Sequence, residues 1–395
     1  MASWKSLRIP RNVLILGVVS FLTDASSDMI YPVLPLFLSE VLGSSIFFIG
    51  LIEGVAESTA SILKVYSGWL SDRLAKRKLL VGMGYGLAAL AKPVLSVTTA
   101  SWQVLMLRFA DRLGKGIRTS PRDALIADST EPERRGISYG FHRAMDSAGA
   151  VLGPLLAFLI LPVVNRNYRA LFLIASVPAI LAVIILLLLL RERKGPREQT
   201  GTRTKLSLSG FDRRFKVFIL AVAVFTLGNS SDAFLLLRAR DLSVGAIYVP
   251  LLWLTMHLVY SLVSSPAGAL SDRIGRKQLI VSGLLVYAAV YVGFALATRS
   301  FHAWLLFALY GLYYGLADGS MRAYVADLVG KDRRGLAFGV YHGAVGLAAL
   351  PASLIFGWLW QWAGPAAAFG LGAGLALLAT LIFALGLRPS CRNGA

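Results

Sequence analysis

The chain has 395 residues, of which 56% are hydrophobic and only 15% are charged. Soluble domains carry roughly 25% charged residues, so this composition excludes an ordinary soluble enzyme and indicates a surface that mostly faces lipid. The formal net charge of +19 would suggest nucleic acid in a soluble protein. Here the basic residues lie in loops between apolar runs, where they determine membrane topology, and no nucleic-acid partner is expected.

Apolar runs of the length that spans a bilayer as a helix recur along the whole chain. The first run is expected to remain as a span, not a cleaved signal, because it is long and contains Asp24 and Asp28. The pattern predicts an all-α integral membrane protein of two six-helix bundles related by an internal repeat. The twelve expected transmembrane helices lie at 12–38, 46–70, 79–98, 102–125, 138–161, 168–190, 214–238, 246–270, 279–298, 303–326, 337–360 and 363–387.

A polar, charged segment containing glycine and proline separates the sixth and seventh runs. It predicts a cytoplasmic linker at 191–213, between an N-terminal half at 1–190 and a C-terminal half at 214–395. Repeated segments support the two halves: GWLSDRLAKRK after the second run matches GALSDRIGRKQ after the eighth, and Ser-Ser-Asp occurs at 26–28 and 230–232. Duplicated halves are typical of transporters that bind solute near the membrane midplane.

Positive charge indicates the orientation. Most of the 40 Lys and Arg residues lie in loops on the side of the N-terminus, whereas the opposite loops contain Arg166, Arg169, Arg240 and Arg299. Basic residues accumulate on the cytoplasmic side of a membrane. We therefore expect a multi-pass protein of the plasma (inner) membrane, surrounded by the lipid bilayer, with both termini cytoplasmic and acting as a monomer.

Two loops and two spans contain motifs of a known kind. Residues 268–277, GALSDRIGRK, resemble the signature loop of the major facilitator superfamily, and residues 68–78 form a second copy in which Ala75 stands where the family usually has glycine. Arg108 resembles the membrane-buried arginine of that family, and GAVLGP at 149–154 is similar to the motif of its proton-coupled exporters.

The resemblance implies that the aspartates of the two loops hold the cytoplasmic side closed in one state and release it in another, with Arg134 or Arg135 completing a charge cluster. The alternative is that the positive charges of these loops serve only to orient the chain in the membrane. A bistable element between rigid bodies is the preferred interpretation. The residues expected to form this gate and to allow helix movement are Gly68, Asp72, Arg73, Gly268, Asp272, Arg273, Gly149, Gly153 and Pro154.

The fourth span departs from the family pattern. After Arg108 the family usually has glutamine three positions on and glycine four positions on, whereas this chain has Asp111 and Arg112. The many charged residues of this span argue against a hydrophobic cationic drug as the substrate. Arg108 and Arg112 are candidates for binding an anionic group, because a guanidinium offers a planar fork to carboxylate or phosphate. Pairing with Asp111 or Glu53 is the alternative.

Carboxylates within the spans are candidates for proton coupling. A charge at mid-bilayer costs about 2.5–3.5 kcal/mol, and burial favours the neutral form of a carboxyl group, which can then take up and release a proton. Asp24 and Asp28 are preferred because no basic residue lies beside them in their span, and Glu53 and Glu57 are further candidates. Glu57 could instead pair with Lys64.

Further polar residues are spaced so that they could face one water-filled cavity. Lys92, near the outer end of the third span, is expected to extend its ammonium toward the interface. The remaining candidates for substrate binding are Asp146, Asp232, Arg238, Tyr314 and Asp318.

These features predict a secondary active transporter that moves a small polar or charged organic solute by alternating access. Proton-driven antiport leading to efflux is the preferred mode, and proton-coupled symport that imports an organic anion or metabolite is the alternative. A membrane-embedded receptor or enzyme is a remote third possibility. The sequence has no HExxH and no phosphate-binding loop, and its single cysteine, Cys391, excludes a thiol cluster. We therefore expect no catalytic residue, metal or cofactor.

Overall fold

The computed structural model describes residues 9–74, 77–131, 134–191, 210–330 and 333–386, except for the side chains of 68–74. Within these ranges the chain is helical and contains no strand. Every predicted span coincides with a helix or with consecutive helical segments. The predicted linker at 191–213 lies almost entirely outside the described residues.

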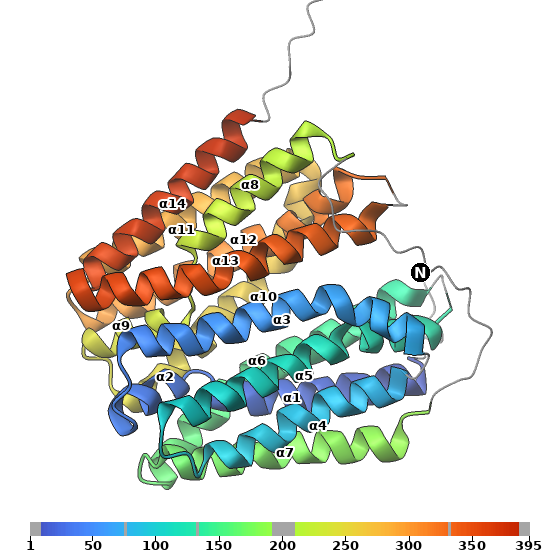
Figure 1. The fold of residues 1–395 in the computed structure, drawn as a ribbon, viewed down its shortest axis with the longest axis horizontal. Coiled ribbons are helices and arrows are strands. Elements are labelled where there is room, and N and C mark those ends of the chain that lie inside the picture. Colours follow the sequence, from blue (N-terminus) through green and yellow to red (C-terminus); the bar gives the residue numbers. More distant parts are fainter. Residues whose placement is uncertain (1–8, 75–76, 132–133, 192–209, 331–332, 387–395) are drawn as a thin grey trace, which may run out of the picture. The chain divides into compact units, whose positions relative to one another are not determined.

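The chain divides into two compact units (Figure 1). Unit 1 consists of the described residues within Met1–Ser44, Thr59–Thr202 and Gly245–Leu254. Its helical elements are α1 (Arg11–Ile30), α2 (Leu34–Leu36), the π-helical turn η2 (Phe37–Val41), the second part of α3 (Ile46–Leu74), α4 (Arg77–Leu95), α5 (Ser101–Asp128), α6 (Arg135–Val163), α7 (Tyr168–Leu189), the 3₁₀ turn η4 (Ala246–Tyr248) and the start of α10 (Val249–Ile274).

Unit 2 consists of the described residues within Ser45–Ser58, Arg203–Val244 and Thr255–Ala395. Helices α3 and α10 are thus each divided between the two units. Its helices are the first part of α3, α8 (Arg213–Gly228), α9 (Ala233–Asp241), most of α10 (Val249–Ile274), α11 (Arg276–Leu296), α12 (Ser300–Asp327), α13 (Arg334–Ala363) and α14 (Pro365–Gly386).

Ten helical segments of the described chain are long and apolar enough to cross a membrane. The two predicted spans outside this group are α5 and α12. Helix α5 is exceptional because basic and acidic residues recur from Arg108 to its end at Asp128. Its charged face must therefore be buried against protein or water within unit 1, since lipid cannot solvate it.

The two units repeat the same packing. In unit 1, α1 packs on α6 and α7, and α4 packs on α5 and α7; in unit 2, α8 packs on α13 and α14, and α11 packs on α12 and α14. An ion pair joins the start of α4 to the end of α5 through Arg77 and Asp128, and Arg276 and Asp327 form the corresponding pair between α11 and α12. The predicted internal repeat is present, and these two ion pairs define its register.

The seventh predicted span is interrupted, which the sequence did not lead us to expect. Residues 24–28, DASSD, lie inside the continuous helix α1. In the matching segment GNSSD, α8 ends at Gly228, and residues 229–232 separate it from α9. Glycine and asparagine are poor helix formers, and Ser231 Oγ accepts a hydrogen bond from the N–H of Ala233 at 3.2 Å. Side chains that bond to the nearby backbone in this way compete with helix continuation.

Local signals also define helix ends elsewhere. The side chain of Asn167 accepts hydrogen bonds from the N–H groups of Arg169 and Ala170, at 3.0 and 3.2 Å, and so caps the start of α7. Between α10 and α11 the turn passes through Gly275, whose φ of 95° suits glycine and few other residues.

Candidate functional site

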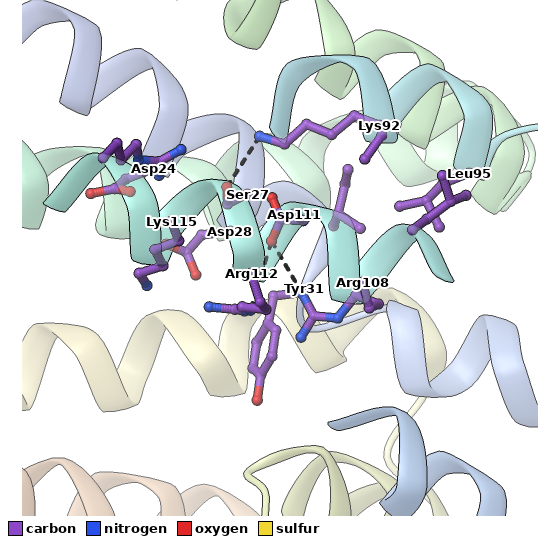
Figure 2. Close-up of a pocket in the computed structure, with 14 residues that line it drawn as sticks. Asp24, Ser27, Asp28, Tyr31, Lys92, Leu95, Arg108, Asp111, Arg112 and Lys115 are labelled. Atoms are coloured by element: carbon purple, nitrogen blue, oxygen red, sulfur yellow. Dashed lines mark hydrogen bonds and ion pairs between the residues drawn. The ribbon is translucent and has the colours of Figure 1, made fainter. Parts of the chain in front are cut away.

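A partly open cavity of about 100 Å³ lies between α1, α4 and α5 of unit 1 (Figure 2). An apolar cavity of about 150 Å³ holds a molecule the size of benzene, so this space suits one small organic molecule or one charged group of it. Basic residues outnumber acidic ones in its lining. The charged lining residues are Asp24, Asp28, Lys92, Arg108, Asp111, Arg112, Lys115 and Arg118.

Asp24 and Asp28 lie one turn apart on α1, where Gly149 and Gly153 of α6 pack tightly against it. A Cβ placed on Gly149 or on Gly153 would lie 2.5 Å from a backbone oxygen of α1, and 3.1 Å from Asp24 Cβ or 2.8 Å from Asp28 Cβ respectively. Only glycine permits this contact, so the predicted exporter motif brings α6 against both carboxylate positions. Asp28 Oδ1 also accepts a hydrogen bond from Trp253 Nε1 at 3.2 Å.

Asp111 is shared by two arginines of α5. Its Oδ2 lies 3.9 Å from Nη1 of Arg108 and 3.7 Å from Nε of Arg112 (Figure 2). The guanidinium of Arg108 also lies 5.6 Å from the centroid of the Tyr31 ring. The structure therefore contains the pairing with Asp111 that the sequence left open, and one carboxylate offsets part of the charge of two cations.

The expectation for Lys92 was wrong. Its side chain is only 3% exposed, and Nζ donates hydrogen bonds to Ser26 Oγ at 2.7 Å, Ser27 Oγ at 3.1 Å and the Thr23 backbone oxygen at 3.4 Å. These three oxygens lie within little more than one turn of α1 and satisfy the ammonium inside the unit. The position of Lys92 near a helix end suggested the interface because the sequence does not show which helix faces it.

Arg118 is a cavity residue that was not selected from the sequence. It is 6% exposed, and its guanidinium lies 4.1 Å from the centroid of the Tyr85 ring. Its Nη1 is buried without a hydrogen-bond acceptor in the described part of the chain. A signal was available, because Arg118 continues the spacing of Arg112 and Lys115 along one face of α5.

Asp146 lies outside the residues that line the cavity. Its Oδ2 is 3.6 Å from Nδ1 of His142, one turn away on α6. Asp146 Oδ1 and His142 Nε2 are both buried and have no hydrogen-bond partner among the described residues. The structure therefore places Asp146 in a local pair with His142 and not with the other candidates for substrate binding.

Three of the residues predicted to bind substrate lie in unit 2, where they contact one another through neighbouring tyrosines. Asp232 accepts hydrogen bonds from the hydroxyls of Tyr310 at 2.5 Å and Tyr314 at 3.3 Å. The ring of Tyr314 packs 5.9 Å from that of Tyr260, whose hydroxyl donates to Asp318 at 3.1 Å. The structure thus connects Asp232, Tyr314 and Asp318. The other two tyrosines of this chain of contacts, Tyr310 and Tyr260, were not identified from the sequence.

Arg238 does not join this chain. Its Nε donates to the backbone oxygen of Phe294 at 3.1 Å, and its Nη2 donates to that of Ala297 at 2.8 Å. These bonds tie α9 to the end of α11. They satisfy carbonyl groups at a helix terminus, which is a structural role.

Replacing Tyr310 with phenylalanine is expected to destabilise the protein by about 1–3 kcal/mol, because Asp232 loses its shortest hydrogen bond inside the unit. Thermal unfolding of the purified protein would measure the change. The matched variant Tyr314→Phe removes a longer bond to the same carboxylate and is expected to have a smaller effect. Equal melting temperatures for Tyr310→Phe and the wild type would contradict this assignment.

The other two candidates for proton coupling lie elsewhere. Glu53 and Glu57 belong to the first part of α3, which is grouped with unit 2, and neither lines the unit 1 cavity. Glu53 is buried, whereas Glu57 is exposed. Of the four carboxylates selected from the sequence, Asp24 and Asp28 are therefore the two that the cavity brings together.

The expected gate is described only in part. The side chains at Gly68, Asp72 and Arg73 lie outside the described residues. In the second copy, Gly268 and Arg273 are exposed, and Asp272 lies 3.5 Å from Arg276, one turn further along the chain. Arg276 also pairs with Asp327, so a three-residue charge cluster is present at this loop within unit 2.

One enzyme-like pattern was overlooked in the sequence. Residues 136–140, GISYG, match the GxSxG pattern of serine hydrolases, in which the serine follows a strand. Here Ser138 lies in the first turn of α6, is 2% exposed and is hydrogen-bonded to Thr130 Oγ1 at 3.1 Å. It cannot act as an exposed nucleophile. The described residues also contain no group of His, Cys, Asp or Glu able to hold a metal.

The whole chain is similar to known proteins in both sequence and fold. The sequence profile described as Major Facilitator Superfamily matches residues 16–252 and 217–393. An uncharacterised MFS-type transporter of Methanocaldococcus jannaschii is 38% identical over 380 residues, covering 95% of this chain and 94% of that protein. The multidrug resistance protein MdtG of Enterobacter lignolyticus is 25% identical over 339 residues, covering 83% of this chain and 78% of that protein.

Solved structures show the same fold at low sequence identity. The nucleoside transporter NupG, as a D323A mutant, matches with a TM-score of 0.78 and 13% identity, covering 95% of this chain and all of that one (100%). A POT family transporter in complex with 5-aminolevulinic acid matches with a TM-score of 0.80 and 14% identity, covering 95% of this chain and 96% of that one. At this identity the likeness concerns the fold alone.

Proposed function

The chain belongs to the major facilitator superfamily and is a multi-pass membrane transporter of small solutes, not an enzyme, and on this basis we propose that it couples solute movement to protons through Asp24 and Asp28. One observation carries the proposal. Both carboxylates line the cavity of unit 1 beside the tight contact that Gly149 and Gly153 of α6 make with α1. A movement of α6 against α1 would change the surroundings of both groups, which is what coupling protonation to conformation requires.

Antiport that leads to efflux is the first proposed mode. The contact of Gly149 and Gly153 with α1 supports it, because these residues belong to the motif that resembles proton-coupled exporters. The relatives named multidrug resistance proteins MdtG and MdtH, at 25% identity, support the same direction. We propose a plasma (inner) membrane location with cytoplasmic termini from the distribution of Lys and Arg.

Symport of an organic anion is the second proposed mode, and the charge of the cavity favours it. Cations outnumber carboxylates in the lining, so an anion is attracted to the site. A bound anion and a bound proton carry opposite charges in one small cavity, and each favours the binding of the other. Ligands that bind together move in the same direction, whereas antiport requires that they exclude one another.

Proteoliposomes with an imposed pH gradient distinguish the two modes. A panel of organic acids, amines and sugars is first screened by thermal shift, because a bound solute raises apparent stability. The best solute is then followed by radiolabel while an internal dye reports pH. Antiport predicts that solute leaving the vesicle is matched by proton entry, and symport predicts that the two enter together. Solute flux without any proton movement would contradict the proposed coupling.

A further inference from the structure

Arg118 lines the cavity of unit 1 but has no part in the proton chemistry proposed above. The carbon of its guanidinium lies over the Tyr85 ring, 4.1 Å from the centroid, and this cation–π contact does not provide an oxygen acceptor for the N–H groups. Within the described residues its buried Nη1 has no acceptor. A buried donor left in this way costs free energy, and an oxygen of a ligand would remove that cost.

The internal repeat shows that the fold does not require a cation at this position. In the register defined by the two ion pairs, Arg118 corresponds to Ala317. A Cβ placed on Gly84 of α4 would lie 2.6 Å from Arg118 Cβ, and one placed on Gly283 of α11 would lie 2.9 Å from Ala317 Cβ. Both units therefore make the same close helix crossing, and unit 2 makes it with a methyl group.

The other cations of the cavity also have uncharged counterparts in unit 2. The matched positions are Lys92 and Tyr291, Arg108 and Phe307, Arg112 and Gly311, and Lys115 and Tyr314. Since unit 2 builds the same bundle without charge at these places, packing does not explain the positive charge of the cavity. Keeping cations inside a membrane protein is costly, so a ligand of opposite charge is the direct explanation.

We propose that the unit 1 cavity binds the carboxylate or phosphate group of a small organic anion and that Arg118 is its principal anchor. Arg118 forms no ion pair with another described residue, whereas Asp111 already offsets part of the charge of Arg108 and Arg112. Carboxylate and phosphate share the paired oxygens that a guanidinium fork binds through two N–H groups. The inference rests on the proposed function in treating the cavity as part of the transport route, and its test measures binding alone, without reference to the direction of transport.

Binding to the purified full-length protein tests the proposal without any pH gradient. Isothermal titration compares succinate, citrate, glycerol 3-phosphate and inorganic phosphate with the neutral compounds succinamide and glycerol. We expect at least one oxyanion to bind and its neutral counterpart not to bind at the same concentration. The variant Arg118→Gln is expected to weaken that binding at least about tenfold, and Arg118→Lys to weaken it less, because the charge remains without the fork.

A matched control separates a local contact from general electrostatic attraction. Arg143 is an exposed residue of α6 outside the cavity lining, and Arg143→Gln is expected to keep wild-type affinity. Neutral compounds binding as well as the oxyanions, no response to any oxyanion, or wild-type affinity in Arg118→Gln would overturn the proposal. If Arg118→Gln does not fold, the proposal is overturned when Arg118→Lys binds the oxyanion with wild-type affinity. Failure of proton coupling is a separate result, since it appears only in flux.

Discussion

Replacing Asp24 and Asp28 together with asparagine is expected to lower solute flux driven by a pH gradient at least about tenfold, as the loss of a proton-transferring group does elsewhere. Asparagine has nearly the size of aspartate but cannot take up a proton, so the solute step and the proton step become separated. Both side chains line the same cavity, which is why the double variant is the decisive one. Flux into proteoliposomes under an imposed gradient measures the effect.

Two controls accompany this experiment. Exchange of labelled for unlabelled solute without a gradient should persist in the double variant, because it requires the cavity but no net proton movement. Glu131→Gln removes an exposed acid of unit 1 whose only ion pair in the described part is a 3.6 Å contact with Arg134, and it should leave flux unchanged. Gradient-driven accumulation at the wild-type level in the double variant would show that the proton binds elsewhere.

Gly153→Ala is expected to destabilise the protein by about 1–3 kcal/mol, the usual cost of overfilling a packed contact, and to impair transport. The added Cβ would lie 2.5 Å from the backbone oxygen of Ala25 and 2.8 Å from Asp28 Cβ. Neither atom belongs to a flexible side-chain end that could move aside. Helix α6 would therefore have to shift away from α1, where close approach of small residues stabilises helix pairs in membranes. Thermal unfolding and the flux assay measure the two effects.

The same helix offers a matched control. Gly140 lies in α6, and nothing lies within 4 Å of the position that a Cβ would occupy there, so Gly140→Ala introduces the same methyl group without a clash. Alanine is the better helix former by up to about 1 kcal/mol, and this variant should be as stable as the wild type or more so. Equal behaviour of Gly140→Ala and Gly153→Ala would mean that the contact between α6 and α1 is not tightly packed.

The sequence alone determined the spans, the internal repeat and the family. Apolar runs specify helices in a bilayer because every backbone hydrogen bond must be made within the segment. Interruptions of a helix within a span were harder to predict. The break at 229–232 follows Gly228 and includes Asn229, yet the identical Ser-Ser-Asp at 26–28 stays helical. The span was predicted from hydropathy, which does not distinguish the two segments, and the lower helix propensity of glycine and asparagine was not considered.

Only the tertiary structure decided which charges share a site. Spacing along α5 places Arg108, Arg112 and Arg118 on one face, but it does not show which helix lies opposite. The burial of Lys92 depends on the oxygens of α1, and the guanidinium of Arg118 lies against the ring of Tyr85 in α4 with its Nη1 lacking an acceptor among the described residues. A helix face is a local property of the sequence, whereas a binding site is a contact between helices. That is why the family followed from the sequence and the anion site required the packed unit.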